Sequence, residues 1–307
     1  MTSSGFTPEN EEKIDRFLRS GAARGALSTL DMDGTCLAND LGEALLYHMA
    51  RSSAFDAATL GQSESLWEPL RRTPALAPTL GELERSLAPR PGPPADQRFV
   101  IQAYWEIARR IDKRTAEWWA ALLLAGRTEE EVRDLARATL DEELERELGA
   151  EPALPGRADS VQIATGLRPY RPMAELIQRL SDQGMECWLV SASPRWAVEV
   201  FAARFLDLPA TRIVAASPAV EDGRIQARPD PGRPFPYGPG KVEAIQALIG
   251  RAPALAAGNS MSDWDMLRLA TGLSLAIDAD EALARRVQEA SRVEPERWIL
   301  QPRFSLV

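Results

Sequence analysis

The chain has 307 residues, of which 45% are hydrophobic and 26% charged, as in an ordinary soluble globular protein. Its net charge of −9 argues against a nucleic-acid groove and against binding to an anionic membrane surface. No apolar run approaches the roughly 18 residues that a membrane helix needs, and the N-terminus lacks the basic start and apolar core of a signal peptide. With two cysteines and one histidine, we expect a cytoplasmic protein without a disulfide framework or a histidine-based zinc site.

The first half of the chain is predicted to be mainly helical. Hydrophobic spacing predicts a helix over 9–20, a strand over 26–31, a helix over 40–51, and long helices over 96–125 and 128–149. Prolines crowd residues 69–94, which favours a long loop with at most a short helix near 79–87. Thr128 and Glu131 match a capping box, and Gly149 is expected to end the last helix.

From about residue 166 the pattern alternates between strands and helices. We expect helices over 173–183, 194–205, 241–250 and 262–270, strands over 186–190, 212–216, 255–257 and 273–277, and a hairpin over 219–227. Such alternation indicates a parallel sheet covered on both faces, which binds ligands beyond the carboxyl ends of its strands. The predicted fold is doubly wound α/β, with a core from residues 1–38 and 165–307 and an all-helical inserted domain over 39–164.

Two carboxylates follow the first predicted strand. Asp31 and Asp33 stand one residue apart, so their side chains point the same way from an extended chain, and Gly34 permits a sharp bend after them. Carboxylates at the end of an apolar strand are costly unless a cation or a reaction uses them. The alternative is an Asp-rich turn with Asp33 and Gly34 as the turn pair.

The run Asp-x-Asp-Gly-Thr from Asp31 to Thr35 resembles the first motif of the haloacid dehalogenase (HAD) superfamily, most of whose members are phosphatases. The resemblance implies that Asp31 attacks phosphorus and forms an aspartyl-phosphate, that Asp33 is general acid and then base, and that Mg²⁺ lies between them. Thr35 completes the motif and is grouped with the catalytic residues. The dehalogenases lack the second acid, so Asp33 favours phosphoryl transfer over dehalogenation.

Ser191 and Lys241 lie in two stretches that resemble the second and third HAD motifs. Ser191 ends a strand before a helix, where its hydroxyl and the backbone N–H groups that follow, from Ala192 on, can hold a phosphate oxygen; the alternative is a helix N-cap. Lys241 opens a helix, where the dipole disfavours a cation, so a lysine there indicates an anionic partner. The alternative is a solvated lysine after a glycine-rich turn.

The run from Gly258 to Asp263 follows an apolar strand and resembles the fourth HAD motif, in which an aspartate more commonly stands at the position of Asn259. A neutral amide oxygen can still coordinate Mg²⁺, a hard cation that prefers oxygen ligands. The resemblance implies a metal site formed by Asp31, Asp33, Asn259 and Asp263. Asp263 is then an anionic ligand or an outer residue that orients the others.

The insertion between the first two motifs resembles the type-1 helical cap of HAD phosphatases, which closes over small phosphorylated metabolites. Phosphoserine phosphatase has this layout, and the segments around Glu43 and Arg168 are similar to phosphorylcholine phosphatase and its relatives. Asp40 and Glu43 are therefore candidates to face a cationic head group, and Arg168 is either a substrate contact or a surface residue near the hinge. The aromatic residues of the insertion form either a cation cage or only a core, and they are Tyr47, Trp67, Tyr104, Trp105, Trp118 and Trp119.

Two functions remain open from the sequence. The first is a Mg²⁺-dependent phosphomonoester hydrolase for a metabolite of the phosphoserine, phosphocholine or phosphoethanolamine type. The second is a HAD-fold binding or regulatory protein whose metal site is weakened by Asn259. The expected partner is a small phosphorylated metabolite, with no nucleic acid and no membrane, and a homodimer is left open.

Overall fold

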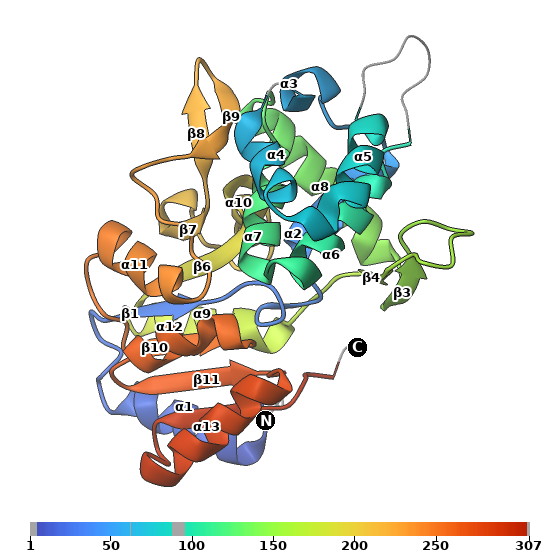
Figure 1. Cartoon of the computed structure of the whole chain (residues 1–307). Helices are drawn as coiled ribbons and strands as arrows, with labels where there is room; N and C mark the ends of the chain where they lie inside the picture. Colours follow the sequence, from blue (N-terminus) through green and yellow to red (C-terminus); the bar gives the residue numbers. More distant parts are fainter. Residues whose placement is uncertain (1–4, 62, 88–95, 306–307) are drawn as a thin grey trace.

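A six-stranded parallel sheet forms the centre of the core in the computed structural model, which describes residues 5–61, 63–87 and 96–305 (Figure 1). In spatial order its strands are β12 (Trp298–Gln301), β11 (Leu273–Ile277), β10 (Leu255–Gly258), β1 (Leu27–Leu30), β6 (Glu186–Pro194) and β7 (Ile213–Ala216). The chain begins in the middle with β1, winds outward through β6 and β7, and then returns to wind the other way. This doubly wound α/β fold confirms the prediction.

Helices cover both faces of this sheet. They are α1 (Pro8–Arg19), α9 (Arg171–Asp182), α10 (Arg195–Phe205), α11 (Pro239–Leu248), α12 (Trp264–Leu269) and α13 (Glu281–Val293), with short 3₁₀ turns η2 (Ala210–Arg212) and η3 (Met261–Asp263). Successive strand residues point to opposite faces. In β6, Leu189 therefore joins the hydrophobic core under α1, α9 and α10, whereas Val190 joins the core under α11, α12 and α13.

The insertion lies beside the sheet, and its helices gather in the upper part of Figure 1. They are α2 (Leu41–Arg51), α3 (Ala57–Gly61), α4 (Glu64–Arg71), α5 (Ala77–Ser86), α6 (Phe99–Arg110), α7 (Lys113–Leu122) and α8 (Glu129–Glu145), with the 3₁₀ turn η1 (Pro74–Leu76). The two chain segments that connect it to the core pair with each other as β2 (Leu37–Ala38) and β5 (Arg168–Pro169). The hairpin predicted over 219–227 is present as β8 (Pro218–Glu221) and β9 (Arg224–Pro229).

Three predictions within the insertion need correction. The single helix predicted over 96–125 is two helices, because Asp112 accepts a hydrogen bond from the backbone N–H of Thr115 at 2.6 Å and caps a new helix. The helix from Thr128 has its capping box but ends at Glu145, and Gly149 instead begins β3 (Gly149–Pro152), which pairs with β4 (Gln162–Thr165). The insertion is therefore not all-helical.

The proline-rich region is more regular than predicted. Helix α4 continues through Pro69, and Pro78 lies in the first turn of α5, where a proline costs no intrahelical hydrogen bond. Residues 88–95 of the predicted loop lie outside the described residues. Within the described ranges, none of the helices combines the length and apolar character that a bilayer crossing needs.

Candidate active site

Strand β1 ends in a tight turn that directs Asp31 and Asp33 into one cavity. The backbone N–H of Asp31 donates to the carbonyl of Ala257 at 2.9 Å, so this residue continues the sheet. The chain then bends at Gly34, whose φ of 71° is in the left-handed region that favours glycine. A Cβ at Gly34 would also lie 1.9 Å from Nδ2 of Asn259, so the absence of a side chain admits the fourth motif.

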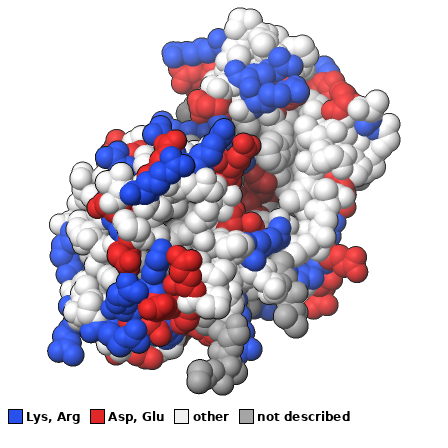
Figure 2. Space-filling model, turned by 90° about the horizontal axis from the view of Figure 1, so that it is seen from below, with Lys and Arg blue, Asp and Glu red and all other residues white. Residues whose placement is uncertain are grey.

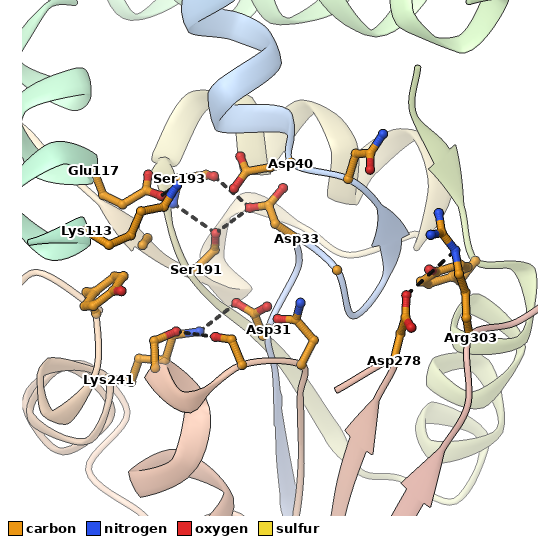
Figure 3. A pocket seen from close by; sticks show the side chains of 18 residues that line it. Asp31, Asp33, Asp40, Lys113, Glu117, Ser191, Ser193, Lys241, Asp278 and Arg303 are labelled. Carbon is orange, nitrogen blue, oxygen red and sulfur yellow. Dashed lines mark hydrogen bonds and ion pairs between the residues drawn. The ribbon is translucent and has the colours of Figure 1, made fainter. Parts of the chain in front are cut away.

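Asp31 is paired with a buried lysine. The Lys241 ammonium donates to Asp31 Oδ1 at 2.6 Å, to Asp263 Oδ1 at 2.5 Å and to the carbonyl of Val190 at 3.0 Å (Figure 3). Lys241 is only 1% exposed, which excludes the solvated alternative. The other oxygen of Asp31 accepts from the Thr35 hydroxyl at 3.1 Å.

Burial and mutual charge set the protonation of this group. Burial, followed by the charge of Asp263, raises the pKa of Asp31 to about 7, although Lys241 opposes the shift. Burial also disfavours the ammonium of Lys241, but Asp263 and Asp31 outweigh it and raise the pKa of that lysine above its ordinary value. Lys241 is therefore charged at neutral pH and holds Asp31 in place.

The second carboxyl, Asp33, is held by three donors. Its Oδ2 accepts from the Ser193 hydroxyl at 2.7 Å and from the Ser191 hydroxyl at 3.3 Å, and its Oδ1 accepts from the backbone N–H of Leu41 at 2.7 Å. Burial raises the pKa of Asp33 to about 6, against these hydrogen bonds, which lower it. A carboxyl with that pKa exchanges a proton near neutral pH, as a general acid and base must.

The fourth motif uses its aspartate to fix both a loop and the lysine. Asp263 Oδ2 accepts from the backbone N–H groups of Asn259 at 2.9 Å and Ser260 at 3.1 Å, while its Oδ1 binds Lys241. A Cβ at Gly258 would lie 2.4 Å from the Asp263 Cβ, so glycine is required there. Asp263 is fully buried and does not line the cavity, whereas Asn259 does.

The residues at this corner suit a divalent cation that prefers oxygen. Asp31, Asp33 and Asn259 line the cavity side by side and offer carboxylate and amide oxygens, the donor set that Mg²⁺ accepts together with several waters. Asp263 already has partners for both oxygens, so its geometry here suits an orienting contact behind the ligands.

The cavity has a volume of about 400 Å³ and lies between the core and the insertion. Figure 2 shows the molecule hollowed between its two parts, with acidic side chains inside the hollow. Asp31 and Asp33 lie centrally, with Lys113 and Glu117 of α7 on one side (Figure 3). On the other side Asp278 and Arg303 form an ion pair at 3.7 Å.

The side of the cavity facing the insertion carries a charged cluster, which consists of Asp40, Glu43, Lys113 and Glu117. The carboxylate oxygens of its three acids all lie within 4.8 Å of one another. The Lys113 ammonium contacts Glu43 Oε1 and pairs with Glu117 at 3.2 Å. It also lies 4.8 Å and 4.6 Å from the ring centroids of Tyr104 and Trp105. A protein lysine thus occupies the aromatic cage that the sequence left open for a substrate cation.

Excess negative charge perturbs the acids of this cluster. Burial raises the pKa of Glu117 to about 7, although Lys113 opposes the shift, and burial together with Asp33 and Glu43 raises the pKa of Asp40 well above its usual range. Although burial disfavours the ammonium, Glu43 and Glu117 raise the pKa of Lys113 above its ordinary value. The cluster is therefore short of positive charge when its acids ionise.

The raised pKa of Glu117 predicts a pH-dependent stability. The folded protein binds this proton more tightly than the unfolded chain, so the stabilisation is complete below about pH 4.5 and is lost as the pH rises through 7. Glu117→Gln removes the titration, so chemical denaturation should show the variant gaining about 2–3 kcal/mol relative to wild type between pH 5 and pH 8. Glu289→Gln, at an exposed glutamate of α13, is the matched control and should show no such gain. A constant difference for Glu117→Gln would contradict the expectation.

Several residues proposed from the sequence do not line the cavity. Glu43 is buried behind it, where it accepts hydrogen bonds from Tyr47 at 2.9 Å and Tyr104 at 3.1 Å. Arg168 donates to the backbone carbonyls of Leu144 at 2.9 Å and Arg146 at 2.8 Å, where α8 ends. Thr35 is buried against Asp31, whereas Asp40, Ser191, Ala192 and Lys241 do line the cavity.

Other cavity residues were missed from the sequence, namely Lys113, Glu117, Ser193, Tyr237, Asp278 and Arg303. Ser193 could have been found, because it follows Ser191 at the strand period of two. Asp112 is a residue type that favours N-caps, and it could have indicated the helix break that places Lys113 and Glu117 at the site.

Comparison with known sequences identifies the family. The sequence model of haloacid dehalogenase-like hydrolases matches residues 29–268. The chain belongs to the haloacid dehalogenase-like hydrolase family. The match includes Asp31, Ser191, Lys241 and Asp263, and it ends before Arg303. No curated protein matches the chain in sequence.

Solved structures share the fold of this HAD-like hydrolase. A conserved protein of unknown function from Anaerococcus prevotii DSM 20548 is 19% identical, with a TM-score of 0.72 over 95% of this chain and 94% of that one. A protein of unknown function from Bordetella pertussis Tohama I is 17% identical, with a TM-score of 0.57 over 90% and 98%. A substrate-bound phosphoserine phosphatase is 14% identical, with a TM-score of 0.43 over 86% and 90%.

Proposed function

We propose that this HAD-like hydrolase is a phosphomonoester hydrolase that requires Mg²⁺ and forms an aspartyl-phosphate on Asp31. The observation that carries the proposal is the position of the Asp31 carboxylate, which lines a cavity 2.6 Å from the buried ammonium of Lys241. Asp33, an acid with a pKa of about 6, lines the same cavity. A nucleophile, a fixed cation and a proton donor are the parts that phosphoryl transfer needs.

The proposed reaction has two steps. A carboxylate oxygen of Asp31 forms a bond to phosphorus, the bond between phosphorus and the leaving oxygen breaks, and Asp33 donates its proton to that oxygen. Asp33, now ionised, takes a proton from a water whose oxygen bonds to phosphorus. The bond from phosphorus to Asp31 then breaks and orthophosphate leaves.

The barrier to this reaction is high, and an enzyme must lower it by about 20 kcal/mol or more. Lys241 is buried and already oriented, so it stabilises charge on the phosphoryl oxygens without reorganisation; a unit charge at ~4 Å is worth about 4 kcal/mol at an effective dielectric of ~20. Ser191 and the backbone at Ala192 line the cavity as further donors. Bound Mg²⁺, held by Asp31, Asp33 and Asn259, would screen the carboxylate from the phosphate and polarise a phosphoryl oxygen.

The charged cluster supports a substrate that carries a primary ammonium. Asp40 Oδ2 and Glu117 Oε2 accept no hydrogen bond from the residues that the structure describes, and both acids line the cavity. A primary ammonium can donate to both carboxylates, whereas a quaternary ammonium cannot donate and needs an aromatic cage. Lys113 already fills that cage. We therefore favour phosphoethanolamine or phosphoserine over phosphocholine.

Activity assays test both parts of this proposal. We expect hydrolysis of an aryl phosphate that requires Mg²⁺ and stops with a chelator, and a higher kcat/KM for phosphoethanolamine or phosphoserine than for phosphocholine. A preference for phosphocholine would refute the role given to Lys113 while leaving the reaction in place. Inactivity with every divalent cation would refute the reaction itself and return Asn259 and a regulatory protein to consideration.

A further inference from the structure

Ser193 makes the shorter of the two serine contacts to Asp33. Its hydroxyl donates to Asp33 Oδ2 at 2.7 Å, compared with 3.3 Å for Ser191. Alternate residues of an extended strand point the same way, so both serines reach the same carboxyl from the end of β6. Figure 3 shows the two hydroxyls directed at Asp33 from one side.

The two serines have different surroundings. The Ser191 hydroxyl also accepts a hydrogen bond from the backbone N–H of Ser193 at 3.0 Å. The Ser193 hydroxyl is confined from the other side by Gly42, in the first turn of α2, where a Cβ would lie only 2.4 Å away. Ser193 is 2% exposed, so it has little room to turn away from Asp33.

The insertion also contacts the same carboxyl directly. The backbone N–H of Leu41, the first residue of α2, donates to Asp33 Oδ1 at 2.7 Å. Each oxygen of Asp33 therefore has a fixed donor, one from the insertion and one from the core. Removing either donor frees the carboxyl to rotate about its own bond.

We propose that Ser193 is a positioning residue, held between Gly42 and Asp33, that keeps the Asp33 carboxyl aligned for proton transfer to the leaving oxygen. The inference rests on the proposed phosphatase function. It predicts that loss of the Ser193 hydroxyl weakens proton donation and leaves substrate binding nearly unchanged.

Dependence on the leaving group separates this role from a structural one. An alkyl leaving group needs a proton in the transition state, whereas 4-nitrophenolate leaves with little help. We expect Ser193→Ala to lower kcat for phosphoethanolamine by about 10-fold to 100-fold, to lower kcat for 4-nitrophenyl phosphate far less, and to leave KM nearly constant. Ser191→Ala, the neighbouring control, should instead affect both substrates and raise KM, because it removes a phosphate contact.

Gly42→Ala provides a second variant that leaves Ser193 in the chain. Its methyl group displaces the Ser193 hydroxyl, so we expect the same selective loss on the alkyl substrate, and little further loss when it is combined with Ser193→Ala. Equal losses on both substrates, or a change in KM alone, would overturn the positioning role while the proposed function stands. A wild-type protein inactive on both substrates would overturn the proposed function and this inference with it.

Discussion

Asp31→Asn should lower the rate of phosphomonoester hydrolysis by about 10⁴-fold or more, because an amide cannot form the phosphoryl bond that the reaction needs. The side chain keeps its shape, and its oxygen can still accept from Lys241 and Thr35. Lys241 also keeps its contact with Asp263 at 2.5 Å, so the variant should fold. Steady-state kinetics with saturating Mg²⁺ measure the loss.

Thermal unfolding and circular dichroism provide the control for Asp31→Asn. A folded variant that keeps a sizeable fraction of wild-type activity would show that another group attacks phosphorus. Asp33→Asn offers a comparison, since it should leave the nucleophile in place and affect alkyl phosphates more than aryl phosphates.

Lys241→Met should cost both stability and activity. The buried carboxylates Asp31 and Asp263 would lose their shared counter-charge, and an uncompensated buried charge costs about 3–5 kcal/mol. Loss of a preorganised cation at the phosphoryl group should lower kcat by about 10²-fold to 10³-fold. Denaturant unfolding and kinetics at one pH measure the two effects.

A second substitution separates stability from catalysis at this lysine. Lys241→Met combined with Asp263→Asn removes one of the two unpaired carboxylates, so part of the lost stability should return. Activity should not return, because no cation replaces Lys241. Recovery of activity in the double variant would mean that the lysine acts only by balancing buried charge.

The residues that could be predicted from the sequence lie where strands end. Asp31, Ser191 and Asn259 follow β1, β6 and β10, which are neighbours in the sheet. Because parallel strands present their carboxyl ends at one edge, a local pattern at each strand end was enough to bring these residues together. Lys241 required only its unfavourable place at a helix start.

The residues that could not be predicted depend on packing between distant segments. Glu43 was expected to face a ligand, but Lys113 reaches it from a helix whose start the sequence spacing had concealed. Asp278 and Arg303 flank β12, a strand that the sequence analysis did not identify, and their place in the cavity depends on the order of the last strands.

Trapping the covalent intermediate would test the central claim most directly. The protein is mixed with an aryl phosphate and Mg²⁺, quenched in acid and digested, and its peptides are weighed. We predict one added phosphoryl group on the peptide that contains Asp31, labile to hydroxylamine and absent from Asp31→Asn. A phosphoryl group on another residue, or turnover with no trapped intermediate under any quench, would contradict the assignment of Asp31 as nucleophile.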